Sequence, residues 1–95
     1  MKVTWGSRAR RDLHELIAYI ADDSVRSAEL VSNRIWRAVA ALAIAPRSGR
    51  LGRVAGTREL VVPRTPYILV YRIRSRGVLI LRVYHGARRW PSRFD

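Results

Sequence analysis

The sequence contains no cysteine, and it has only two histidines, His14 and His85, which lie far apart in the chain. A chain without cysteine has no disulfide framework and no thiolate metal site, and two distant histidines argue against zinc. We therefore expect no metal and no cofactor. The chain also lacks an apolar run near the ~20 residues that a membrane span needs, and no signal-peptide h-region precedes its first charged stretch. These absences predict a soluble cytoplasmic protein with no membrane contact.

Acidic residues are scarce, with 7 Asp and Glu against 19 Lys and Arg, and the net charge is +12. A compact domain of this charge repels itself, which indicates an acidic partner or a phosphate backbone. Lys2 is the only lysine. The arginine guanidinium is planar and binds carboxylate or phosphate through two parallel bonds, so the charge suits acidic protein segments and nucleic acid about equally.

Helical periodicity predicts two helices in the first half of the chain. Ser7 is a candidate N-cap for a helix over residues 8–21, and the sequence Asp22 to Ser24 then breaks the pattern. The second helix ends before Pro46, which forbids continuation. The linker is short, so the two helices should form an antiparallel hairpin. The apolar stripe expected on the second helix consists of Ala28, Val31, Ile35, Ala38, Val39 and Leu42.

Two apolar runs, residues 67–73 and 78–83, flank a polar turn that ends in Gly77, and this pattern predicts a β-hairpin. A loop with an even number of residues would pair Arg72 with Leu79, Val70 with Leu81 and Ile68 with Val83. One face would then carry Ile68, Val70, Arg72, Leu79, Leu81, Val83 and His85. The other would carry Tyr67, Leu69, Tyr71, Ile73, Val78, Ile80, Arg82 and Tyr84. Both faces are largely apolar, so both need a cover.

Shorter elements complete the expected architecture. Residues 2–5 are β-prone and fit an edge strand, residues 58–62 form a further strand, and two prolines make residues 63–66 a tight turn. Residues 46–57 form a basic, glycine-rich loop. The order predicts an α+β fold, in which an N-terminal strand and a two-helix antiparallel hairpin pack on a small antiparallel β-sheet. The 95 residues make one domain, 1–95.

The common catalytic motifs are missing. No acid is placed to orient either histidine, and the glycines at 49, 52 and 56 match neither a dinucleotide-binding nor a phosphate-binding loop. His85 could serve as a general acid at the end of the sheet, but packing or hydrogen bonding is the favoured role.

The segments GRLGRVAGTREL, PYILVYRI and above all LRVYHGARRWP resemble the RelE/ParE superfamily of bacterial type II toxins. The likeness covers essentially the whole chain, and its strongest motif is His85, Arg88, Trp90 and Pro91. It implies a toxin that is neutralised by a cognate antitoxin in a hetero-oligomer. The resemblance also places Tyr67, Leu69 and Tyr71 toward the helices, and Ile68, Val70, Arg72 and His85 outward.

The superfamily divides into RelE-like mRNA nucleases, which act on the ribosome, and ParE-like inhibitors of DNA gyrase. Where the nuclease branch has a groove arginine this chain has Ile68, and where that branch places lysines it has Arg58, Glu59 and Leu60. Loss of one preorganised cation at a reacting phosphate costs roughly 10²–10³ in rate, by analogy with oxyanion-hole deletions. We therefore favour a gyrase inhibitor that acts by protein–protein contact, with ribosome-dependent mRNA cleavage as the alternative.

Three sets of site residues follow from this interpretation. Because Arg and Trp often dominate interface energies, the expected target-binding residues are Arg47, Arg50, Arg53, Arg88, Arg89, Trp90 and Arg93. Under the nuclease alternative the catalytic residues would be Arg50, Arg53, Arg72, Arg82 and His85. An acidic antitoxin segment is expected to cover an exposed aliphatic strip formed by Ile68, Val70, Leu79, Leu81 and Val83, and to bind Arg72 on the same face.

Overall fold

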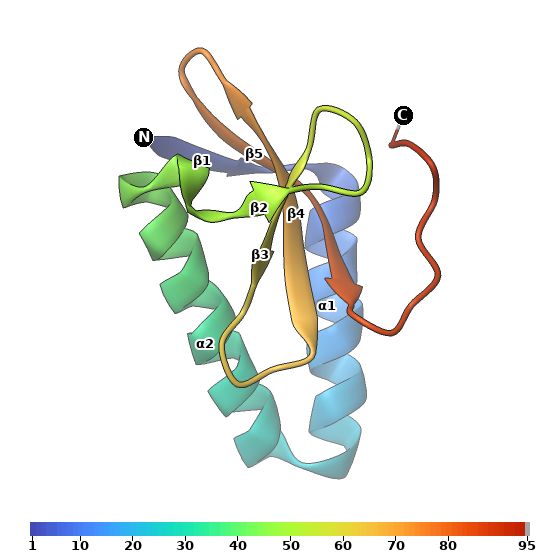
Figure 1. The fold of residues 1–95 in the computed structure, drawn as a ribbon. Coiled ribbons are helices and arrows are strands. Elements are labelled where there is room, and N and C mark those ends of the chain that lie inside the picture. The colour runs from blue at the N-terminus through green and yellow to red at the C-terminus, as the bar shows by residue number, and fades with distance from the viewer. Residues whose placement is uncertain (95) are drawn as a thin grey trace.

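A computed structural model describes residues 1–94. It is a two-layer α+β domain in which a helical hairpin lies on one side of a five-stranded sheet (Figure 1). The strand order is β1-β5-β4-β3-β2. The elements are β1 (Lys2–Trp5), α1 (Ser7–Asp23), α2 (Val25–Ile44), the 3₁₀ turn η1 (Pro46–Ser48), β2 (Arg50–Leu51), β3 (Arg58–Val61), β4 (Tyr67–Arg74) and β5 (Gly77–His85). None of the described helices is both long and apolar enough to cross a membrane.

The helices lie where the periodicity predicted them. Helix α1 begins one residue earlier than expected, with Gly6 rather than Ser7 at its N-cap and no side-chain cap. Ser24 caps α2, since its hydroxyl accepts a hydrogen bond of 3.1 Å from the Ser27 N–H. The predicted stripe on α2 faces the sheet, and all its members except the half-buried Val31 are buried.

The sheet is mixed rather than wholly antiparallel. Strands β2 to β5 form an antiparallel meander, but β1 pairs parallel with β5, with Lys2 opposite Gly77 and Trp5 opposite Ile80. The expected loop at residues 46–57 also contains regular structure, η1 and β2.

A β-bulge at Leu81 changes the hairpin register that the sequence predicted. Arg72 does pair with Leu79, but Tyr71 pairs with Ile80 and Val70 with Arg82, which leaves Leu81 without a partner. An extra residue in one strand turns every side chain that follows it in that strand to the opposite face from the one expected without the bulge. The predicted pairs Val70–Leu81 and Ile68–Val83 are therefore wrong.

The same bulge reverses the faces of the second half of β5. Val83 faces the helices as part of the core, whereas Arg82 and Tyr84 lie on the opposite face, opposite Val70 and Ile68. His85, expected to point outward, lies beside Tyr67 on the helix side.

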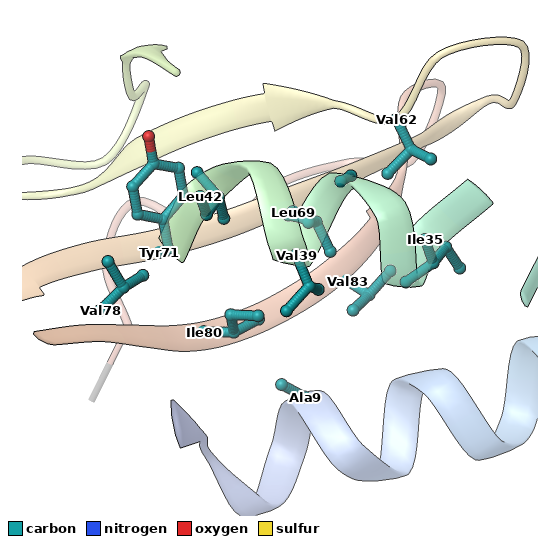
Figure 2. Close-up of a cluster of buried hydrophobic side chains, with 11 residues drawn as sticks. Ala9, Ile35, Val39, Leu42, Val62, Leu69, Tyr71, Val78, Ile80 and Val83 are labelled. Carbon is teal, nitrogen blue, oxygen red and sulfur yellow. The ribbon is translucent and has the colours of Figure 1, made fainter. Parts of the chain in front are cut away.

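The core lies between the helical hairpin and one face of the sheet (Figure 2). Leu69 and Tyr71 face the helices, as the resemblance implied. The Tyr71 hydroxyl donates to the Pro46 carbonyl oxygen at 2.7 Å and accepts from the Gly49 N–H at 3.0 Å, so it fixes the turn after α2. The buried cluster consists of Ala9, Ile35, Ala38, Val39, Leu42, Val62, Leu69, Tyr71, Val78, Ile80 and Val83.

Candidate functional site

The sheet face that points away from the helices is covered by two segments of the chain itself. Figure 1 shows the 52–57 loop projecting from β2 toward the C-terminal tail, residues 86–94, which turns back toward the loop so that Arg53 stacks on Trp90. Under this cover Ile68 is 5% exposed and Val70 is fully buried. The exposed aliphatic strip expected for the antitoxin is therefore wrong: Ile68, Val70 and Val83 are buried, and Leu79, Leu81 and Arg72 are half-buried.

A buried carboxylate organises the loop. The Glu59 side chain, on β3, is only 1% exposed. Its Oε1 accepts from Arg50 Nε at 3.2 Å and Nη2 at 2.9 Å, and its Oε2 accepts from the Arg53 N–H at 2.7 Å. The Arg53 Nε also lies 3.4 Å from Oε2. Glu59 thus pairs with both Arg50 and Arg53, balances one of their two charges, and fixes the backbone at Arg53.

These contacts set the protonation of Glu59. Burial alone would raise the pKa of this carboxyl, but the hydrogen bonds from the Arg53 N–H and the Arg50 side chain, with the charges of both arginines, outweigh it. The pKa of Glu59 is therefore lower than its ordinary value of 4.5.

We expect this lowered pKa to make the stability depend on acid pH. A carboxyl whose folded-state pKa lies below its unfolded-state pKa contributes stability above the latter and loses it as the pH falls through the former. Glu59→Gln should therefore be less stable than the native chain at pH 7. The difference in free energy of unfolding between the two proteins should become smaller below about pH 4.5. Urea unfolding of both proteins across this range checks it. If the difference in free energy of unfolding is the same at pH 7 and pH 3, the predicted pH dependence is wrong.

The tail is attached to the sheet by aromatic contacts. The Arg53 guanidinium carbon lies 3.7 Å from the centre of the Trp90 ring, and Trp90 packs edge-on against Tyr84 at 5.0 Å between ring centres. Phe94 lies 5.8 Å from Tyr84, and the Arg88 guanidinium carbon lies 4.5 Å from it. Loop and tail therefore form one surface, which we call the loop–tail surface: residues 50–57 and 86–94.

Arg82 is held by the first helix. Its Nε and Nη2 donate to the two carboxylate oxygens of Asp12, at 2.8 and 3.0 Å, and the Val83 N–H donates to the same carboxylate at 2.9 Å. The Asp12 hydrogen bond is the main cause that raises the pKa of Arg82 above its ordinary value. The Asp12 carboxylate thereby accepts a hydrogen bond from the edge of β5 beyond the last residue that pairs with β1.

His85 packs rather than faces a reaction centre. Its ring lies edge-on to Tyr67 at 5.7 Å, and its Nδ1 accepts from the Ala87 N–H at 3.1 Å. Arg72 points to the opposite face of the sheet from His85 because of the bulge at Leu81. His85 is therefore separated from the other four candidate catalytic residues, which lie on the outer side of the sheet, and three of those four are paired with Glu59 or Asp12.

The candidate target-binding residues are mostly brought together. Arg50 lies on β2 and Arg53 lies in the loop, and the tail residues border a pocket of about 430 Å³ next to the loop. Arg47 does not line this pocket and lies on η1. The pocket lining consists of Arg8, Arg82, Tyr84, Arg88, Arg89, Trp90, Pro91, Arg93 and Phe94.

Sequence reasoning missed Arg8, Asp12, Glu59, Tyr84 and Phe94 as members of this region. The scarcity of acids was the available signal, because a lone carboxylate in a strand among arginines is a natural ion-pair centre. No group of three or more His, Cys, Asp or Glu side chains within residues 1–94 could hold a metal ion.

The arrangement of helical hairpin, sheet and basic tail is found in known proteins. The family model described as the ParE toxin of the type II toxin-antitoxin system parDE matches residues 3–90. The chain therefore belongs to the ParE family of type II toxin–antitoxin toxins.

Individual relatives also bear the names of toxins, RelE among them as well as ParDE. The chain is 50% identical over 91 residues to "Putative toxin Y4kP" of Sinorhizobium fredii. The matched residues cover 96% of this chain and 94% of the relative. It is 38% identical over 87 residues to "Toxin RelE2" of Caulobacter vibrioides, covering 92% and 97%. A solved chain from "Chromosomal ParDE TA system from P. aeruginosa" superposes with a TM-score of 0.77 at 25% identity, covering 90% and 95%. The chain is thus a type II toxin, and its partner is an antitoxin.

Proposed function

We propose that this toxin acts in the cytoplasm by binding DNA gyrase through its loop–tail surface, and that it catalyses no reaction of its own. The observation that carries the proposal is the ion pairing of the candidate catalytic arginines. Arg50 and Arg53 share the single carboxylate of Glu59, and Arg82 is paired with Asp12. A phosphodiester cleavage site needs cations preorganised for developing charge. Arginines already bound to carboxylates are poorly suited to that role.

Protein binding, in contrast, needs only a rigid surface of suitable composition. The loop–tail surface carries Arg88, Arg89 and Trp90, whose residue types are enriched among interface hot spots. The stacking of Arg53 on Trp90 holds the tail in place, so less conformational freedom is lost when a partner binds.

Induction of the toxin without its antitoxin tests the target. We expect filamentous cells, a DNA-damage response and cleaved plasmid DNA, while bulk protein synthesis continues at first. Purified toxin should likewise inhibit supercoiling by purified gyrase. Immediate arrest of translation, with transcripts cut within ribosome-bound codons, would refute gyrase as the target.

One observation favours the nuclease as a second candidate. The pocket beside the tail gathers Arg8, Arg88 and Arg89, which could bind the phosphates of a messenger RNA. Under this alternative the site would lie in the tail rather than at His85. The induction experiment separates the two targets.

His85→Ala is expected to leave most of the toxicity intact. The ring contacts Tyr67 and a tail N–H, which are packing roles, whereas a general acid contributes about 10²–10⁴ in rate. Colony counts on induction measure the effect, with His14→Ala, at an exposed position on α1, as the matched control. Complete loss of toxicity in a variant that stays folded by circular dichroism would point to acid catalysis.

A further inference from the structure

The pocket of about 430 Å³ beside the C-terminal tail, which we call the tail pocket, concentrates positive charge. Its lining contains no acidic residue and five arginines: Arg8, Arg82, Arg88, Arg89 and Arg93. Arg82 is paired with Asp12, but Arg8 and Arg89 form no hydrogen bond or ion pair with residues 1–94. A cleft lined by charges of one sign attracts ligands of the opposite sign. The tail pocket is therefore suited to an anion.

Arg8 lines the tail pocket from the first turn of α1, where a cation is unfavourable. The amino end of a helix carries a partial positive charge, so acidic residues are preferred there. The first turn of α1 has no acidic residue, and Gly6 supplies no side-chain cap. A smaller pocket of about 160 Å³ at this helix end shares Arg8 and Arg82 with the tail pocket. An anion held by the tail arginines would also offset the charge at this end of α1.

The aromatic rings of the tail pocket are poorly placed to stack on bases. Tyr84 is 1% exposed, and Arg53 stacks on the Trp90 ring. The exposed residues of the lining are four arginines and a proline: Arg8, Arg88, Arg89, Pro91 and Arg93. Single-stranded nucleic acids are recognised largely through bases that stack on aromatic rings, and protein partners largely through side chains that fill desolvated sockets. Exposed guanidinium groups without either feature suit the repeated phosphates of a duplex.

We propose that the tail pocket binds the phosphate backbone of duplex DNA, and that the toxin thereby engages gyrase together with the DNA that gyrase holds. A guanidinium group binds two phosphate oxygens through parallel hydrogen bonds. Such contacts fix a protein on a duplex without reading its sequence. The link to gyrase rests on the function proposed above and leaves residues 50–57 for the protein contact. Binding of DNA by the pocket is measured without gyrase.

Replacement of two pocket arginines by glutamine is the direct test. The variant is Arg8→Gln with Arg89→Gln, and the control is Arg26→Gln with Arg37→Gln. The control removes the same charge at exposed positions on α2, which lies far from the tail in Figure 1. The probe is a short labelled DNA duplex, titrated by fluorescence anisotropy at several salt concentrations against toxin refolded without its antitoxin.

We expect the pocket variant to change the salt dependence of DNA binding. Each phosphate contact contributes about 0.9 to the slope of log affinity against log salt, so the slope should fall by roughly 2. Affinity at low salt should fall by at least about tenfold. The control variant should keep the native slope. Equal slopes for the two variants would overturn the proposal.

The native toxin supplies a second measurement, which decides the proposal even if the pocket variant misfolds. The Trp90 ring belongs to the pocket lining, whereas Trp36 is 49% exposed on α2. Addition of the duplex should shift the indole N–H resonance of Trp90 in a nitrogen–proton correlation spectrum and leave that of Trp36 in place. A shift at Trp36 without one at Trp90 would place the DNA elsewhere and overturn the proposal.

Competition identifies the class of anion. Duplex DNA of another sequence should displace the labelled probe, whereas polyglutamate and single-stranded RNA of equal total charge should not. Displacement by polyglutamate would assign the pocket to carboxylates, and displacement by single-stranded RNA would assign it to bases, so either result would overturn the proposal.

The gyrase link has its own test. Immobilised native toxin should capture at least about tenfold more gyrase when DNA is present, because two linked contacts then act together. The pocket variant should lose this gain. A toxin that binds DNA through the pocket but does not inhibit purified gyrase would refute the gyrase target alone. A toxin that inhibits gyrase, while both double variants bind DNA equally, would refute the pocket alone.

Discussion

Asp12→Ala is expected to lower the free energy of unfolding by about 3–5 kcal/mol, a large part of the roughly 5–15 kcal/mol that stabilises a typical domain. The Arg82 and Asp12 side chains are 15% and 10% exposed. Removing the carboxylate leaves the guanidinium charge largely out of water without a partner, and it also leaves the Val83 N–H without its acceptor.

Urea unfolding of the refolded toxin measures this loss. Asp12→Asn should fall between the native chain and Asp12→Ala, because an amide oxygen still accepts one hydrogen bond while the charge is lost. Asp23→Ala, at the exposed end of the same helix, is the control. If Asp12→Ala and Asp23→Ala have the same stability, the ion pair does not fix α1 to the sheet.

Arg89→Glu is expected to reduce gyrase inhibition by at least about 30-fold, the equivalent of a 2 kcal/mol hot spot. Arg89 is exposed and lines the pocket of the loop–tail surface, and it forms no hydrogen bond or ion pair with residues 1–94. The substitution should therefore leave the fold intact and act only on the target. Reversal of charge adds repulsion where the partner is acidic.

The inhibitory concentration in a gyrase supercoiling assay measures the effect. Arg26→Glu makes the same change of charge at an exposed position on α2, away from the loop–tail surface, and should retain full inhibition. Equal inhibition by the two variants would move the target-binding site away from the tail.

The elements of this fold could be predicted because their signals are local. The spacing of Ala28, Ile35, Val39 and Leu42 fixed the buried face of α2, and Pro46 marked its end. The bulge could not be predicted, since one extra residue at Leu81 leaves the apolar run of β5 unbroken. That single residue exchanged the faces of Val83 and Tyr84, and with them the environment of His85.

The candidate site was predicted in composition but not in arrangement. The sequence pointed to the arginines of the loop and tail, yet nothing near Glu59 in the chain indicates that Arg50 and Arg53 both bind it. Nor does the tail sequence indicate that Trp90 packs on Tyr84. The first set of contacts depends on the alignment of β2 with β3, and the second depends on the bulge in β5 that turns Tyr84 to the outer face.

The parallel pairing of β1 with β5 also governs when the toxin becomes complete. Lys2 pairs with Gly77, so the first strand to leave the ribosome must wait for the last one to be synthesised. At roughly 5–20 residues per second, this wait lasts several seconds. The tail that packs on Tyr84 emerges later still. The loop–tail surface of a nascent chain therefore cannot assemble until β5 and residues 86–94 have both left the ribosome.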